Sequence, residues 1–190
     1  MGPVESPAPD PRLSAVRAAL EQRADRGPVD AREAAALRRF RAELAVLPEP
    51  FDEHAGPVHV TASAIVTGRP GVILLRHKRL GLWLQPGGHL DPGEEPLAAA
   101  RREVLEETGL TASVVEDGPV HIDVHGGGRG HVHLDLRWQM VAEGTPAPGP
   151  DESQDVRWFS WDAAIDLAES GLRGALLALR PAPPRSGGLP

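Results

Sequence analysis

Residues 88–110 read GHLDPGEEPLAAARREVLEETGL, and this stretch decides the fold of the chain and the place of its chemistry. Apolar and alanine residues recur at helical spacing from about residue 96 to 107. Residues three and four apart share one face of a helix, so Glu103, Glu106 and Glu107 should project together. The sequence therefore predicts a helix that carries three carboxylates on one side.

Three like charges at this spacing repel each other and raise one another's pKa unless something positive lies among them. A divalent cation with oxygen ligands removes that conflict, and carboxylates with water suit magnesium or manganese. A solvated acidic helix face remains the alternative at this point. On the other sides of the helix, Val104 and Leu105 are expected to point toward a core, and Gly109 to end the helix in a left-handed conformation.

The positions around the glutamates make the pattern specific. Gly88 lies six residues before Glu94, and Glu94 lies eight residues before Arg102. Together with the glutamates, Gly109 and the apolar Leu110, they match every fixed position of the Nudix box, and the chain is identified as a member of the Nudix hydrolases. The resemblance implies an α/β/α sandwich and a magnesium-dependent enzyme that cuts a phosphoanhydride bond, with manganese as an alternative ion.

The resemblance also implies roles for individual residues. It makes the metal-binding set Glu103, Glu106, Glu107 and the backbone of Gly88, where paired glycines allow a tight turn and a close carbonyl. Arg102 is expected to hold the carboxylate of Glu94 or Glu103 by a bidentate contact. A carboxylate must take the proton of the attacking water, and the catalytic candidates for that role are Glu103 and Glu152.

Glu152 is weighed separately because it lies outside the box. It precedes Trp158 by six residues, and many Nudix proteins carry a glutamate and a tryptophan at similar spacing. In MutT-like members of the family that glutamate completes the metal site. A plain surface-loop acid beside Asp151 and Asp155 is an equally good interpretation.

The eight histidines form the second group of candidates. His131 and His133 lie two apart on an expected strand, so both should face the same side, and His121 and His125 belong on or beside a neighbouring strand. His89 follows the Pro-Gly-Gly turn, near the expected phosphates. His89, His125 and His133 are candidate substrate-binding residues; binding of a second metal and a purely structural role are the alternatives.

The remaining sequence predicts the surroundings of the box. Expected strands are 58–67, 71–77, 82–84, 112–115, 120–124, 131–141 and 155–159, and a terminal helical region covers 161–179. This order predicts an α/β fold with a mixed sheet between helices, preceded by a helical hairpin at 11–23 and 30–47. The predicted segments are a disordered tail 1–11, an N-terminal helical extension 12–50, a Nudix hydrolase domain 51–180 and a disordered tail 181–190.

Composition narrows the function. A formal charge of −7 gives no footprint for a nucleic-acid backbone, and the absence of a signal segment or a long apolar run predicts a cytoplasmic protein without a membrane. The expected partner is a small-molecule nucleotide or other diphosphate substrate, with a homodimer left open. The alternative to an enzyme is a non-catalytic Nudix-fold module that senses a ligand or serves as a scaffold.

Absent residues limit the substrate further. The chain has no tyrosine, which diadenosine-polyphosphate hydrolases typically carry, and no cysteine, on which the related isopentenyl-diphosphate isomerases depend. Residues 122–126 lack the proline usual in ADP-ribose pyrophosphatases. A MutT-like nucleoside triphosphate pyrophosphohydrolase remains by elimination.

Overall fold

The computed structural model describes residues 10–182, so most of the two tails predicted at 1–11 and 181–190 lies outside the described part. The helices are α1 (Pro11–Asp25), α2 (Ala31–Leu44), α3 (Pro96–Thr108), α4 (Trp161–Leu167) and α5 (Ser170–Leu179), with a short 3-10 turn at Gly128–Gly130. The strands are β1 (Val58–Gly68), β2 (Gly71–Arg76), β3 (Trp83–Leu84), β4 (Gly87–His89), β5 (Ser113–Val114), β6 (His121–Gly126), β7 (Val132–Val141) and β8 (Val156–Phe159).

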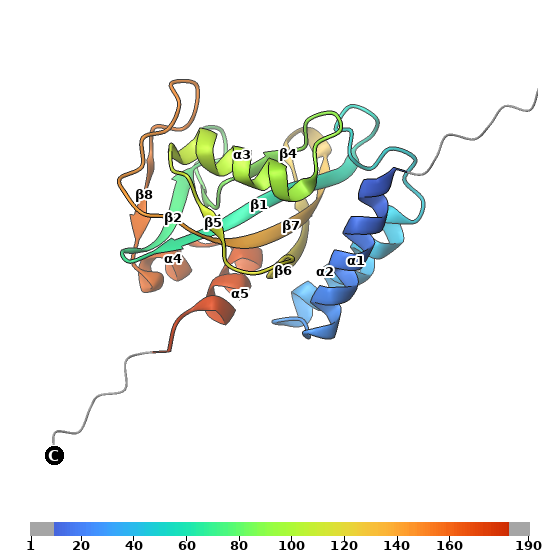
Figure 1. The fold of residues 1–190 in the computed structure, drawn as a ribbon, viewed down its shortest axis with the longest axis horizontal. Helices are drawn as coiled ribbons and strands as arrows, with labels where there is room; N and C mark the ends of the chain where they lie inside the picture. The colour runs from blue at the N-terminus through green and yellow to red at the C-terminus, as the bar shows by residue number, and fades with distance from the viewer. Residues whose placement is uncertain (1–9, 183–190) are drawn as a thin grey trace, which may run out of the picture.

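The strands form one mixed sheet, as predicted. Its main order is β3-β2-β1-β7-β5, with β4 paired to β1, β6 to β7 and β8 to β2. β1 and β7 pair in parallel over ten residues, and the other pairs are antiparallel. The two longest strands therefore lie side by side at the centre of the sheet (Figure 1).

Helices lie on both faces of this sheet, which confirms the α/β/α sandwich and its N-terminal hairpin (Figure 1). Alternate residues of a strand point to opposite faces, and the even-numbered Ala62 and Ala64 of β1 pack in one core with Ala99 and Val104 of α3. On the other face, Ile65 packs with α4 and α5. The same alternation turns the odd-numbered residues at the start of β1 away from α3.

A buried ion pair joins the two helices of the hairpin, and its carboxylate also binds the sheet. Nε and Nη2 of Arg23 donate to Glu33 over 2.8 and 2.7 Å, and these side chains are 5% and 0% exposed. Glu33 also accepts hydrogen bonds from the backbone N–H groups of Val29 (2.7 Å) and of Ile122 in β6 (2.9 Å). A single carboxylate thus joins α1, α2 and the sheet.

Three local features differ from the sequence expectation. Leu105 is 53% exposed, so it does not point into the core as expected, whereas Val104 is fully buried. Residues 87–89 form a strand on β1 where only a turn was expected. The terminal helical region is split, because Ala168 is extended between α4 and α5. The break lets Gly171 at the start of α5 lie directly against Asp123 of β6, where a Cβ would overlap the carboxylate.

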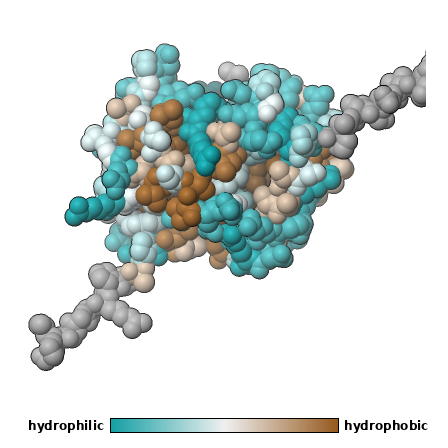
Figure 2. All heavy atoms as spheres, viewed as in Figure 1, coloured by the Kyte–Doolittle hydropathy of each residue, from teal (hydrophilic) through white to brown (hydrophobic). Residues whose placement is uncertain are grey.

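On the face shown in Figure 2, hydrophilic side chains surround a group of apolar side chains near the middle. Among the exposed large hydrophobic residues are Val115, Val141 and Leu177. In residues 10–182, no helix combines the length and hydropathy that a membrane crossing requires.

Candidate functional site

A cavity of about 610 Å³ lies where α3, β4 and the strands β1, β6 and β7 meet. Its lining includes Glu103 and Glu107 from α3, Gly87 and Gly88 from β4, and polar side chains from the sheet. Glu103, Glu107 and the histidine-bearing strands therefore face one common space.

The two glycines of β4 let the backbone lie directly on the carboxylates. The backbone N–H of Gly87 donates to Oε2 of Glu107 over 2.9 Å. A Cβ on Gly88 would overlap the carboxylate of Glu103, so only glycine permits this approach. Glu106 is more open, with its side chain 49% exposed. Helical spacing and the glycine turn together place Glu103 beside Gly88 and Glu107 beside Gly87, while Glu106 lies farther out on the same helix.

Arg102 holds these carboxylates in place. Its Nε and Nη2 form a bidentate contact with Glu94, at 3.1 and 2.9 Å. Its Nη1 donates to Glu103 (2.8 Å) and Glu106 (3.1 Å), and its Nη2 also donates to the carbonyl of His89 (2.9 Å). Of the two partners left open by the sequence, Glu94 forms the bidentate contact and Glu103 a single hydrogen bond. Arg102 is thus a positioning residue for the acidic group.

The electrostatics of the carboxylates suit a cation. Burial raises the pKa of Glu103, and burial together with the charges of Glu103 and Glu152 raises the pKa of Glu107 to about 8. Burial opposes ionisation of Glu94 as well, but the hydrogen bond from Arg102 keeps its pKa below the usual value. Carboxylates that lie close together resist ionisation because their negative charges repel each other. A divalent cation that prefers oxygen ligands would supply the missing positive charge.

Glu152 is carried to this group by a loop that docks on the end of α3. The N–H groups of Ala147 and Gly149 donate to the carbonyls of Thr108 and Glu106, over 2.8 and 3.1 Å. The N–H of Glu152 then donates to the carbonyl of Gly149 over 3.1 Å. Since its charge contributes to the raised pKa of Glu103 and Glu107, Glu152 lies near them. The proximity is compatible with the predicted role in the site.

A grid of polar side chains on β1, β7 and β6 supplies much of the remaining lining of the cavity. The three rows of the grid are His59, His133 and His125; Thr61, Asp135 and Asp123; and Ser63, Arg137 and His121. Directly paired residues on neighbouring strands present their side chains on the same face. Strand register therefore brings together residues that are far apart in the sequence.

The second and third rows are tied together by hydrogen bonds. Asp135 accepts from Thr61 (3.1 Å), Ser63 (2.8 Å) and Nε of Arg137 (2.8 Å). Nη2 of Arg137 donates to Asp123 over 2.9 Å. Although burial works against it, the contacts with His125 and Arg137 hold the pKa of Asp123 well below its usual value. Hydrogen bonds and ion pairs with Arg137 therefore connect the two buried aspartates of this part of the grid.

The histidines divide into two groups. His89, His125 and His133, the three substrate-binding candidates, all line the cavity, and His131 joins them. His121 lies at the far end of the grid, 3.4 Å from Arg137, where burial lowers its pKa to about 3.

His59 also belongs to the group around His89 and His133, and the sequence reasoning missed it. Its ring centre is 5.0–5.1 Å from those of His89, His131 and His133. Because β1 looked like an ordinary apolar strand, His59 was not considered. Its alternation with Thr61 and Ser63 was the available signal for a polar face.

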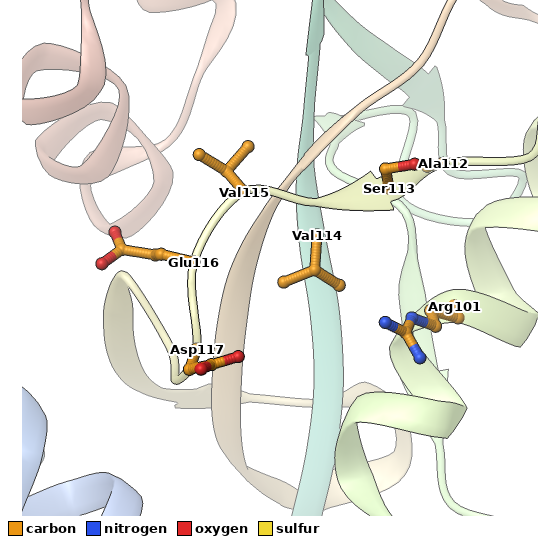
Figure 3. Close-up of a pocket in the computed structure, with 7 residues that line it drawn as sticks. All are labelled: Arg101, Ala112, Ser113, Val114, Val115, Glu116 and Asp117. Atoms are coloured by element: carbon orange, nitrogen blue, oxygen red, sulfur yellow. The ribbon is translucent and has the colours of Figure 1, made fainter.

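A second hollow of about 540 Å³ lies at the edge strand β5 and is shown in Figure 3. It is lined by Arg101 and residues 112–117, and the labelled Val114 lies between the arginine and the acidic Asp117. Glu116 pairs instead with Arg26 of the hairpin. The hollow contains none of the predicted site residues.

Comparisons with known proteins agree with this geometry. A family model described as the NUDIX domain matches residues 57–179, more than half of the chain. An isopentenyl-diphosphate Delta-isomerase of Streptomyces griseus is 33% identical over 122 residues, which cover 60% of this chain and 61% of that protein. An RNA pyrophosphohydrolase of Mesorhizobium japonicum is 32% identical over 105 residues, which cover 46% of this chain and 60% of that protein.

Solved structures share the fold. A hydrolase of the NUDIX family from Clostridium perfringens superposes with a TM-score of 0.56 at 24% identity, covering 63% of this chain and 92% of its own. The chain spans about three fifths of the length of the two curated relatives described above.

Proposed function

The chain belongs to the Nudix family, and from this premise we propose that it is a divalent-metal-dependent hydrolase of phosphoanhydride bonds. The substrate class is a nucleoside diphosphate linked to another group, most simply a nucleoside triphosphate that releases pyrophosphate. One observation carries the proposal: Glu103, Glu106 and Glu107 lie on one side of α3, where Arg102 binds Glu103 and Glu106, and the glycines of β4 lie against Glu103 and Glu107.

The residues fit magnesium or manganese as the resident ion. Glu103, Glu106, Glu107 and the backbone of Gly88 would hold it, since carboxylate and carbonyl oxygens are the donors that these ions prefer. When bound, such an ion would neutralise phosphate oxygens and make a water molecule easier to deprotonate. The raised pKa of Glu107, about 8, supports this assignment because the charge of the ion favours the ionised carboxylate.

The proton of the attacking water goes to Glu103 or Glu152. Glu103 is the more buried candidate and is oriented by a 2.8 Å hydrogen bond from Arg102. Glu152 is free of that arginine and is held by its loop against the end of α3. Loss of a general base costs about 10²–10⁴-fold in kcat. Because Glu103 is also a proposed metal ligand, Glu152→Gln is the decisive variant: a loss of that size under saturating metal assigns the base to Glu152, and an unchanged kcat assigns it to Glu103.

A substrate panel tests the proposal. The full chain is assayed for phosphate or pyrophosphate release with magnesium and with manganese. The panel holds nucleoside triphosphates, nucleotide sugars, dinucleoside polyphosphates and an RNA oligonucleotide with a 5′-triphosphate. The RNA is included because one relative is named as an RNA pyrophosphohydrolase, although the charge of −7 disfavours it. Metal-dependent turnover of any member, lost in the double variant Glu106→Gln/Glu107→Gln, supports the proposal. No turnover of any member contradicts it.

Two other functions are separated by the same panel. The Streptomyces relative is named as an isomerase, so isopentenyl diphosphate is added and isomerisation is followed. The absence of cysteine argues against that activity. A ligand-sensing or scaffold module would bind a panel member without turnover. Such degenerate domains usually lose box glutamates, and this chain keeps all of them.

A further inference from the structure

Three histidines on the strands β1, β4 and β7 form a compact triangle. The ring centres of His59, His89 and His133 are separated by 5.0, 5.1 and 5.1 Å. The residues come from three different strands, and one donor nitrogen from each lies within 4.8 Å of the other two. The arrangement is fixed by strand pairing, because His59 is opposite His133 and His89 is opposite Thr61.

We propose that His59, His89 and His133 bind a transition-metal ion of the zinc class, separate from the ion held by the carboxylates. Imidazole nitrogens suit zinc, cobalt, nickel and related ions, whereas magnesium prefers oxygen. Three histidines with an open position are a common ligand set for reactive zinc. The proposal concerns binding and does not require that the chain hydrolyse anything.

The size of the triangle agrees with tetrahedral coordination. A metal–nitrogen bond of about 2.0–2.1 Å puts the centre of an imidazole ring about 3.2 Å from the ion. Tetrahedral angles then separate two ring centres by about 5.2 Å, close to the observed 5.0–5.1 Å. In such a complex the donor nitrogens would be about 3.3 Å apart, whereas in this structure they lie within 4.8 Å of one another. Small ring rotations, without movement of the strands, close that difference.

The second nitrogen of two of the rings already has a partner. Nδ1 of His89 lies 3.2 Å from Glu53, and Nδ1 of His59 lies 3.4 Å from the carbonyl of Gly56. A carboxylate or carbonyl on the outer nitrogen is the usual arrangement around a metal-bound histidine, since it fixes the tautomer and the ring orientation. It leaves Nε2 of His59 and Nε2 of His89 as acceptors available to a cation.

Those inner nitrogens lack any partner among residues 10–182. Nε2 of His59 and Nε2 of His89 are both buried without a hydrogen bond, and His59 is only 1% exposed. A buried polar atom left without a partner destabilises the folded protein. A bound ion would satisfy both atoms at once.

The proposed ion would complete the cavity. His89 immediately follows Gly88, whose backbone lies on Glu103, so the two ion sites share strand β4. An open coordination position would face the cavity and accept an oxygen or nitrogen of the group attached to the phosphates. His89 and His133 would then contact a substrate through the ion, whereas His125 remains free to contact it directly.

Cobalt titration of the chelator-treated full chain, in excess magnesium, tests the proposal. Tetrahedral cobalt absorbs strongly in the visible range, and zinc should displace it with one-to-one stoichiometry. Single variants His89→Ala and His133→Ala should weaken cobalt binding by at least about 100-fold, and Glu53→Gln by about 10–100-fold. His125→Ala is the matched control, because His125 belongs to the same cluster but not to the triangle.

The outcomes separate this proposal from the hydrolase. Glu106→Gln/Glu107→Gln should bind cobalt like the wild type while losing the magnesium-dependent turnover. A wild-type chain that shows no tetrahedral cobalt spectrum overturns the histidine site and leaves the carboxylate site untouched. Equal losses in His125→Ala and His89→Ala would also overturn the assigned ligand set. Folding of each variant is checked by circular dichroism, and His89→Asn provides a second, smaller change at the same position.

Discussion

The buried carboxylate of Glu33 offers the sharpest test of how the hairpin is attached. In Glu33→Gln the side chain keeps its size, but the guanidinium of Arg23, 5% exposed, loses its counter-charge. Breaking a buried ion pair by removing one partner costs about 3–5 kcal/mol. Glu33 also accepts the backbone N–H groups of Val29 and Ile122, and the amide retains only one acceptor oxygen for four donors.

A loss of about 3–5 kcal/mol is a large share of the ~5–15 kcal/mol that stabilises a typical domain. For a chain of 190 residues, each kcal/mol lowers Tm by about 2–4 °C, so Glu33→Gln should melt about 6–20 °C below the wild type. Circular dichroism melts and urea unfolding measure this difference. Hydrogen exchange at the N–H of Ile122 should also accelerate.

The matched control is Glu43→Gln on the same helix. Glu43 pairs with Arg39 at 3.5 Å, and these side chains are 28% and 51% exposed. Exposed pairs of this kind contribute about 0.5 kcal/mol or less. The reasoning is refuted if Glu33→Gln is as stable as this control. The double variant Arg23→Met/Glu33→Leu should recover part of the lost stability, because it leaves no unpaired buried charge. If it recovers none, the loss comes from the backbone hydrogen bonds that Glu33 accepts.

Four further predictions concern the site and its pH dependence. Gly88→Ala should lower magnesium affinity and turnover at least about 10-fold, because its Cβ overlaps the Glu103 carboxylate, whereas Gly56→Ala, with open space around it, should leave both unchanged. Arg102→Lys should lower kcat more than it changes Tm, because lysine cannot form the bidentate contact. Magnesium should raise the Tm of the chelator-treated chain, because it binds the folded state. Burial lowers the pKa of His121 to about 3, so the folded state resists a proton that the unfolded chain takes up below about pH 6.5. The free energy of unfolding should therefore decrease by about 2–3 kcal/mol as the pH is lowered from 7 to about 4.5. His121→Gln should remove this contribution to the pH dependence of stability.

Contrary results would be equally informative. Unchanged metal affinity in Gly88→Ala would mean that the cation does not use the carboxylate beneath β4. Equal kcat for lysine and arginine at position 102 would remove its positioning role. If magnesium does not change the Tm of the chelator-treated chain, the folded state does not bind the ion. If His121→Gln leaves the loss of stability at low pH unchanged, that loss belongs to other titratable groups.

The box helix and its carboxylates could be predicted because the information is local. Helical spacing alone puts Glu103, Glu106 and Glu107 on one side, and a left-handed Gly109 ends α3 as expected. Reliance on local information also explains why the prediction that Leu105 points into the core was wrong. Local periodicity does not tell which apolar residues the sheet covers, and in α3 the buried stripe runs through Ala99, Ala100 and Val104 instead.

The histidine triangle was only partly predictable because it depends on pairing between distant strands. His59 and His133 meet through the parallel register of β1 and β7, and the side-chain bonds across this pair join residues 72–74 positions apart. His89 joins them because residues 87–89 add to β1 as a strand. A single sequence carries no direct signal of such register. The docking of Glu33 on β6 was missed for the same reason.

The parallel pairing of β1 and β7 also governs the order in which the molecule can assemble. More than sixty residues lie between these strands, so the centre of the sheet cannot close until the chain beyond residue 132 is available. Non-local pairing of this kind costs loop entropy before it gains contacts, and it slows folding. We expect α3 and the β1–β2 hairpin to form first, with burial of Trp138 in β7 as the late step seen by stopped-flow fluorescence. The cavity, which needs both strands, would then be the last part of the protein to acquire its shape.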